Sequence, residues 1–138
     1  DQINIIINAF GEEDMRYITP EKIKNLIMRG PMYSVPKLLQ DIHFNKEHNE
    51  NHNIYIPNKK LPYAKIYDGD KWVLTKKKEA IEDMTNKAFN LISDTDGIDK
   101  KISQIREDYE NGDKKTINRL KDDTELMILN NQISIEHP

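Results

Sequence analysis

Apolar residues change their spacing twice along the chain, and this change limits the folds open to it. Over residues 23–42 they recur every three or four positions, which marks the buried face of helices. Over residues 54–74 they form short runs of strand length, and from residue 81 helical spacing returns. Because strands and helices occupy separate stretches, the pattern predicts an α+β fold, a small antiparallel β-sheet with packed helices.

Local signals indicate where the first helices begin. Thr19 followed by Pro20 predicts the start of a short helix that stops near Gly30. Ser34, with Pro36 in the first turn, predicts the start of a second helix.

Strand signals occur at the N-terminus and in the middle of the chain. Alternating isoleucines over residues 3–7 predict an N-terminal strand. Residues 54–56 and 64–67 predict two further strands. Asp68-Gly69 favours a tight hairpin turn, after which residues 72–74 form the returning strand.

The last part of the sequence is helical. Thr75 is expected to cap a long helix, and apolar seams over residues 98–109 and 117–127 predict two more. We expect a C-terminal helical hairpin or tail that packs on the core or on a partner. This divides the chain into a core domain, 1–94, and a helical tail, 95–138. The expected core residues are Ile5, Ile27, Leu38, Leu39, Ile42, Ile54, Ile56, Ile66, Trp72, Val73, Ile81 and Met84.

Composition excludes several classes of protein. The chain has 138 residues, of which 36% are hydrophobic and 33% charged, as expected for one small hydrophilic domain with or without an appended helical piece. It has no cysteine, which excludes disulfides and thiol catalysis, so a metal would rest on His, Asp or Glu. No apolar run is long enough for a membrane span and no signal peptide is visible, so we expect an intracellular protein without membrane contact. Because it begins at Asp1 rather than Met, we expect a piece of a longer protein.

The run from Asp41 to Asn58 holds three of the four histidines, and two kinds of chemistry fit it. His43, His48 and His52 are candidates for three imidazole ligands of zinc or another divalent ion. Asp41, His43 and His52 supply the residue types of a metal-dependent His-Asn-His nuclease, in which one histidine activates water beside a bound metal.

An ordered polar loop explains the same run without chemistry. Asparagine side chains bond nearby backbone groups, so the asparagines over residues 45–53 can hold a compact loop together. In this interpretation His43 ends a helix, where a partly charged imidazole is favourable, His48 is exposed and His52 is hydrogen-bonded. We favour this loop, and therefore expect no catalytic residue, no metal ligand and no cofactor.

A basic segment follows this run. Residues 59–78 hold seven lysines and two aspartates, which gives 7 − 2 = +5, whereas the whole chain carries −3. The lysines are Lys59, Lys60, Lys65, Lys71, Lys76, Lys77 and Lys78. They are candidates for phosphate contacts in nucleic-acid binding, with Tyr63, Tyr67 or Trp72 available to stack on bases. The alternative is that they are solvated lysines that protect strand edges, with the aromatic residues in the core or on a sheet face.

Several separated motifs resemble a domain of giant nucleocytoplasmic DNA viruses of the mimivirus type. The resemblance covers about residues 3 to 84. The motifs are Asn8 to Met15, Arg29-Gly30, Ser34 to Leu39, Ile42 to Asn45, Glu50 to Ile56 and Tyr67 to Trp72. It implies a C-terminal module, often preceded by a small zinc finger and a coiled coil, and supplies no catalytic residue. It also implies a location in the host cytoplasm or the viral factory.

Three functions from different classes remain open. The first, which we favour, is a non-enzymatic interaction or assembly module of a nucleic-acid-associated viral protein, with a protein partner or a second copy bound by the helical tail. The second is a nucleic-acid-binding domain that uses residues 59–78. The third is the metal-dependent nuclease.

Overall fold

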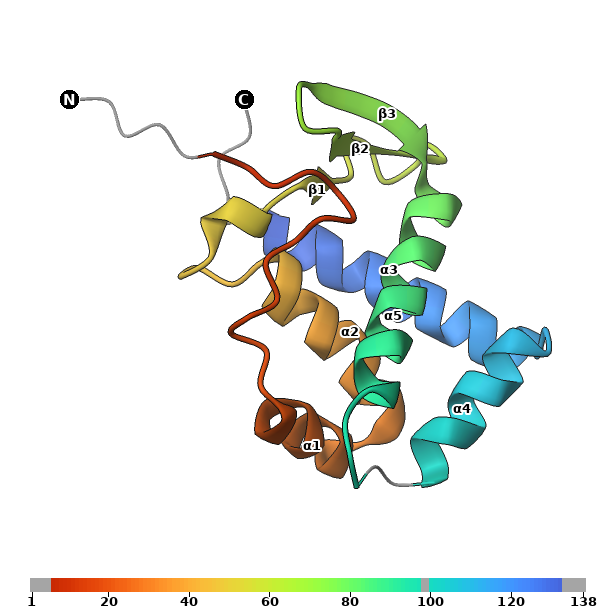
Figure 1. Cartoon of the computed structure of the whole chain (residues 1–138). Helices are drawn as coiled ribbons and strands as arrows, with labels where there is room; N and C mark the ends of the chain where they lie inside the picture. Colours follow the sequence, from red (N-terminus) through yellow and green to blue (C-terminus); the bar gives the residue numbers. More distant parts are fainter. Residues whose placement is uncertain (1–5, 98–99, 133–138) are drawn as a thin grey trace.

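The computed structural model describes residues 6–97 and 100–132. Its elements are, in chain order, helices α1 (Pro20–Arg29) and α2 (Pro31–His43), the short 3-10 helix η1 (Asn49–Asn51), strands β1 (Ile54–Tyr55), β2 (Tyr63–Tyr67) and β3 (Trp72–Lys76), and helices α3 (Lys77–Ser93), α4 (Lys100–Glu110) and α5 (Lys114–Gln132). The sheet lies at one end of the molecule and the helices form the rest (Figure 1). The predicted α+β class is confirmed. Within the described residues, no helix has both the length and the apolar character needed to cross a bilayer.

The sheet is antiparallel in the order β1-β2-β3. Its inner face is formed by Ile54, Ile66 and Val73, which lie opposite one another on the three strands. The predicted Asp68-Gly69 hairpin is confirmed: the backbone N–H of Asp68 donates to the carbonyl of Lys71 at 3.0 Å, and Gly69 takes a positive φ of 105°. Thr75 does not cap α3, because β3 continues to Lys76 and the helix starts directly after it.

The first helix begins as predicted and the second does not. The hydroxyl of Thr19 accepts the backbone N–H of Lys22 at 3.2 Å, and Pro20 is the first residue of α1. Gly30, with φ at 152°, separates the two helices, so α2 begins already at Pro31. Proline suits a first helical position, where its missing N–H needs no partner. Ser34 therefore lies inside α2 rather than at its start.

The C-terminal helices use their apolar seams within the chain itself. Ile102 of α4 and Leu120 and Ile128 of α5 are buried in the one hydrophobic core, and α5 packs against α2, α3 and β1. The side-chain amide of Gln132 adds a clamp to the sheet: its oxygen accepts the Ile56 N–H at 2.7 Å, and its nitrogen donates to the Ile56 carbonyl at 2.8 Å. The helical tail thus closes one side of the core.

The described part of the N-terminal segment, from residue 6, runs along the polar loop without forming a strand. The N–H of Asn8 donates to the Glu50 carbonyl at 2.7 Å, and the N–H of Phe10 donates to the Tyr67 carbonyl at 2.8 Å. Residues 6–9 have no strand conformation, and residues 1–5, including the predicted core residue Ile5, lie outside the described residues.

Most of the other predicted core residues are buried. Those that are buried are Ile27, Leu38, Leu39, Ile42, Ile54, Ile56, Ile81 and Met84. Ile66 and Val73 are partly buried on the inner face of the sheet. The prediction for Trp72 is wrong: it pairs with Tyr67 on the opposite face of the sheet, away from this core, because it comes one residue before Val73 in a strand whose side chains alternate.

Candidate functional site

A buried polar chain links three distant parts of the sequence. The carboxylate of Glu13 accepts hydrogen bonds from the Lys87 ammonium at 2.6 Å, from the Asn53 side chain at 2.6 Å and from the Gly11 backbone at 2.7 Å. The oxygen of the Asn53 side chain in turn accepts from Nδ1 of His43 at 2.8 Å. Nδ1 of His43 therefore carries a proton, and Nε2 has no hydrogen-bond partner among the described residues.

Burial sets the protonation of His43, whereas neighbouring groups set that of Glu13. Burial lowers the pKa of His43, and the nearby Glu13 and the bond to Asn53 oppose this without cancelling it. The expectation of a partly charged His43 at the end of a helix is therefore wrong. Burial alone would raise the pKa of Glu13, but His43 and the hydrogen bonds from Lys87 and Asn53 hold it below its ordinary value. The stable arrangement is a neutral imidazole beside a Glu13–Lys87 ion pair.

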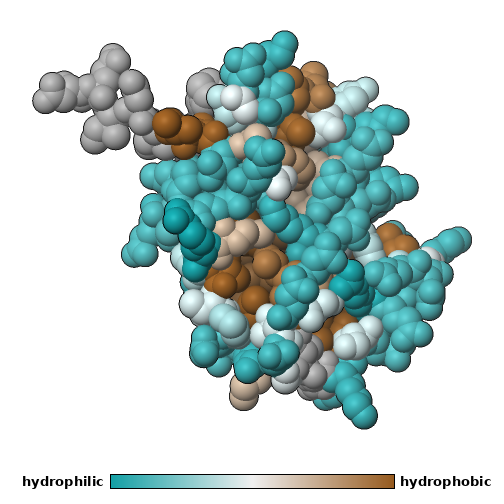
Figure 2. Space-filling model, viewed as in Figure 1, coloured by the Kyte–Doolittle hydropathy of each residue, from teal (hydrophilic) through white to brown (hydrophobic). Residues whose placement is uncertain are grey.

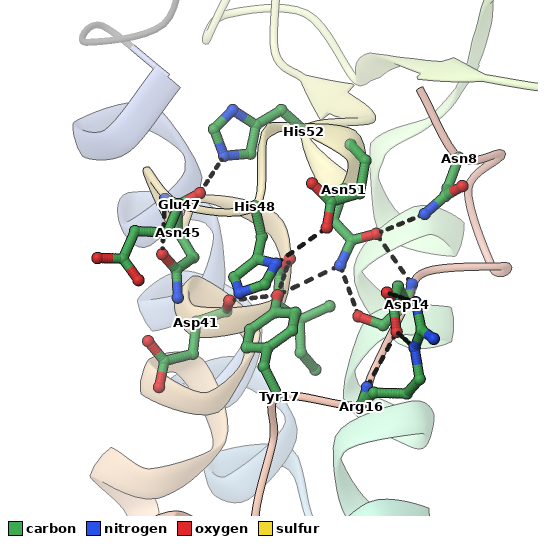
Figure 3. A network of polar contacts seen from close by, with 12 residues as sticks. Asn8, Asp14, Arg16, Tyr17, Asp41, Asn45, Glu47, His48, Asn51 and His52 are labelled. Atoms are coloured by element: carbon green, nitrogen blue, oxygen red, sulfur yellow. Dashed lines mark hydrogen bonds and ion pairs between the residues drawn. The ribbon is translucent and has the colours of Figure 1, made fainter. Parts of the chain in front are cut away.

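A second polar cluster centres on Asn51, which is fully buried. Its oxygen accepts from the side chain of Asn8 at 3.0 Å and the N–H of Asp14 at 2.9 Å, and its nitrogen donates to the Asp14 carbonyl at 2.8 Å (Figure 3). The hydroxyl of Tyr17 accepts from Asn51 at 3.2 Å and donates to the carbonyl of Asp41 at 2.8 Å. Asn51 thereby joins the N-terminal segment to the loop.

The remaining histidines of the loop are also engaged. The ring of His48 stacks on Tyr17 with 3.5 Å between ring centroids, and its Nδ1 pairs with Glu50 at 2.9 Å. The expectation that His48 is exposed is therefore wrong. Nε2 of His52 donates to the Asn45 carbonyl at 2.8 Å, as the loop interpretation expects. Burial lowers the pKa of His52, and the Asn45 bond opposes this.

The fold does not assemble the metal-site or nuclease candidates. His43, His48 and His52 have different partners, and no group of three or more His, Asp or Glu side chains in the described part of the chain is placed to hold a metal ion. Asp41 pairs with Lys22 at 3.6 Å on the outside of α2, whereas His43 is 1% exposed. A buried, hydrogen-bonded imidazole cannot reach the water that a nuclease base must activate.

The outer face of the sheet gathers aromatic side chains and lysines at the surface. Register places Tyr67 opposite Trp72, Lys65 opposite Leu74, and Tyr63 opposite Lys76 on this face, and Tyr55 beside Lys65. The Trp72 ring lies 5.3 Å from the Tyr55 ring and 5.6 Å from the Tyr67 ring. Leu74 is 61% exposed and Tyr63 is 44% exposed. Hydrophobic residues are visible among hydrophilic ones at this end of the molecule (Figure 2).

The seven lysines of the basic segment have different environments. Lys65 and Lys76 lie on the outer face of the sheet, and Lys71 is exposed in the hairpin turn. Lys59 and Lys60 are exposed in the loop before β2, and Lys78 is exposed in the first turn of α3. Lys77 differs: its ammonium pairs with Glu125 of α5 at 3.4 Å and its side chain is 14% exposed.

Sequence reasoning missed Glu13 and Lys87, which organise the buried chain of hydrogen-bonded side chains. Glu13 and Lys87 lie 74 residues apart, and neither sits in a biased segment. Asn51 and Asn53 were expected to hold the loop together, but they bond mainly to the N-terminal segment. One signal was available for Glu13: it falls within one of the motifs that carry the viral resemblance.

Comparison with protein-family models, with curated proteins and with solved structures found no match to this chain.

Proposed function

We propose that this chain is a non-enzymatic module that binds single-stranded nucleic acid on the outer face of its sheet. The observation that carries the proposal is the placement of Tyr55, Tyr67 and Trp72 together on that face, where Lys65 lies opposite Tyr55 and Lys76 lies in the row of Tyr63. Single-stranded nucleic acids are bound by this combination, because aromatic rings stack on bases and cations follow the phosphates.

The face supplies two attractions that differ in kind. Stacking of a base on an aromatic ring is worth about 1–3 kcal/mol and tolerates any sequence. Lysine–phosphate contacts release counterions, so affinity falls as salt rises, with a slope of about −0.7 per phosphate in single strands. The basic charge of residues 59–78 supports this second attraction despite the net charge of −3 of the chain.

Intrinsic fluorescence tests the proposal directly. Trp72 is the one tryptophan of the chain, so its emission reports on this face alone. We expect thymidine and uridine oligonucleotides to quench it at low salt, and the affinity to fall between about 50 and 200 mM salt. Binding without a salt dependence, or no quenching at low salt, would refute the proposal.

Two tyrosines of equal exposure provide a matched control. Tyr63 lies on the outer face and Tyr33 lies on α2, and each is 44% exposed. We expect Tyr63→Ala to weaken binding by about 1–3 kcal/mol, which is roughly 5- to 150-fold, and Tyr33→Ala to leave it unchanged. Equal losses in both variants would show that binding is not specific to the outer face.

A second candidate function is protein binding at the groove between α2 and α5. Tyr33 and Leu126, which is 56% exposed, border a groove of about 320 Å³ there. This candidate retains the expected role of the helical tail in binding a partner or a second copy of the chain. Light scattering tests the second copy: a dimer that becomes a monomer in Leu126→Asp would support it, and a monomer at every concentration would refute self-association.

The viral setting remains a proposal based on the resemblance of residues 3 to 84. In that setting the module would act in the host cytoplasm or the viral factory, next to a zinc finger that contacts DNA.

A further inference from the structure

A groove lies where the outer face of the sheet meets the start of α3. It has a volume of about 410 Å³, within the range of small-ligand sites. Its apolar walls include Pro62, Tyr63 and Ile81, and its rim carries lysines from β3, α3 and α5. The sequence singles out three of these, the consecutive lysines at the positive end of the α3 dipole, as an unfavourable arrangement without an anion nearby.

Among the described residues, only Lys77 of those three lysines has an acidic partner, Glu125, which also lines the groove. Lys77 pairs with Glu125 at 3.4 Å and also donates to the Lys59 carbonyl at 3.3 Å. Lys76 and Lys78 have no acidic partner among the described residues, and neither has Lys121, which reaches the groove from α5. Three unneutralised cations thus surround a mostly apolar recess. A ligand with an anionic part and a flat apolar part complements both features.

The groove continues the outer face of the sheet. Tyr63 and Lys76, the last cross-strand pair on that face, also line the groove. The pairs along the face follow one another every two residues, at intervals of about 7 Å. A nucleic-acid strand whose bases stack on Trp72 and Tyr67 therefore reaches the groove after about 13 Å. On the way it passes the second cross-strand pair, Lys65 and Leu74.

We propose that the groove holds the next nucleotide of the bound strand. Its base lies against Tyr63 and Pro62, and its phosphate lies among Lys76, Lys78 and Lys121. This inference rests on the proposed function, because it extends the path of the same strand. It adds one contact from α5, outside the basic segment that the sequence marks.

Thymidine oligonucleotides of two lengths test this path, with Trp72 fluorescence as the readout. A strand of about two nucleotides covers only the first two rows of the face, and one of about eight also enters the groove. For the longer strand we expect Lys121→Ala to weaken binding by about three- to tenfold and to reduce the magnitude of the salt slope by about 0.7. The shorter strand should bind Lys121→Ala as it binds the unmodified chain.

Two further variants make the result specific. Lys78→Ala, on exposed α3 surface, should reproduce the effect and guards against misfolding of Lys121→Ala. Lys115→Ala removes an exposed charge from α5, the helix of Lys121, outside the groove. It should leave the binding of both strands unchanged. If both groove variants bind the longer strand as tightly as the unmodified chain while Trp72 is still quenched, the groove is not on the path and the proposed function stands. If neither strand quenches Trp72 in the unmodified chain, both proposals fail.

Discussion

The histidine-rich loop and the outer face of the sheet are both biased in composition, but the loop buries its polar side chains whereas the sheet exposes its aromatic and basic ones. In the loop, Asn51 and Asn53 are fully buried and His43 is almost so, and each is hydrogen-bonded within the chain. On the sheet, Leu74 and Tyr63 lie at the surface with large exposed fractions. The difference teaches that a biased composition does not by itself mark a binding site. A better indicator of a binding site is a group of side chains that can still form hydrogen bonds or stacking contacts with a molecule from the solvent.

The largest effect is expected for a substitution that removes the hydrogen bonds of a buried asparagine in the histidine-rich loop. Asn51→Ala removes four side-chain hydrogen bonds and takes away the partner of the partly buried backbone N–H and carbonyl of Asp14. We expect the free energy of unfolding in urea to fall by about 3 kcal/mol. Asn49→Ala, at an exposed position of the same loop, should cost less than about 0.5 kcal/mol. Similar losses in both variants would mean that the Asn51 contacts do not support the fold.

A pH profile sharpens the same comparison. The pKa of His43 is lowered in the fold, so the unfolded chain binds more protons below the ordinary value of 6.5. This contribution to stability is present above that pH and is lost toward the folded pKa, by about 1.4 kcal/mol per pH unit while His43 alone titrates. Glu13, whose pKa is also lowered, adds a loss below about 4.5.

His43→Gln separates the histidine from the other groups. Glutamine is close to histidine in size but does not titrate, so the variant should lose stability less steeply below pH 6.5. His52, whose pKa is lowered by burial, keeps part of the slope. Urea unfolding at several pH values measures both profiles, and identical slopes would exclude His43 as the source.

The smallest effects are expected for substitutions of two lysines of the basic segment, Lys65 and Lys77. Lys65→Ala should weaken binding of a thymidine oligonucleotide only a few-fold and reduce its salt slope by about 0.7, because one phosphate contact is lost. Lys77→Ala should leave the binding of a short strand that does not reach the groove unchanged and cost up to about 1 kcal/mol of stability, because its ammonium already pairs with Glu125. The opposite pattern would show that the phosphates lie on the α5 side of Lys77.

Local chemistry made the fold class predictable. The Thr19 cap, the Asp68-Gly69 turn and the spacing of Leu38, Leu39 and Ile42 each act within a few residues, and all were found. The start of α2 was missed because Pro31 and Gly30 together outweigh Ser34, and Trp72 was misplaced by a shift of one residue, which reverses the face in a strand.

The candidate sites depend on long-range contacts that periodicity does not reveal. Nothing local pairs Glu13 with Lys87, and nothing local distinguishes Lys77 from Lys76 or Lys78. Only the tertiary arrangement decides which charge is neutralised and which remains at the surface. The sequence therefore marks the basic segment as a candidate but does not say which of its lysines share a face with the aromatic rings.

The Gln132 amide bears on how the chain folds in time. It bonds to Ile56 across 76 residues, with the geometry of a neighbouring strand. A contact of that separation forms only after a large loop has closed, which makes α5 a late-docking element and slows folding relative to a bundle with local contacts. During synthesis on a ribosome, the α1–α2 pair and the β2–β3 hairpin would emerge before α5. Their apolar surfaces would stay exposed to solvent until α5 docks.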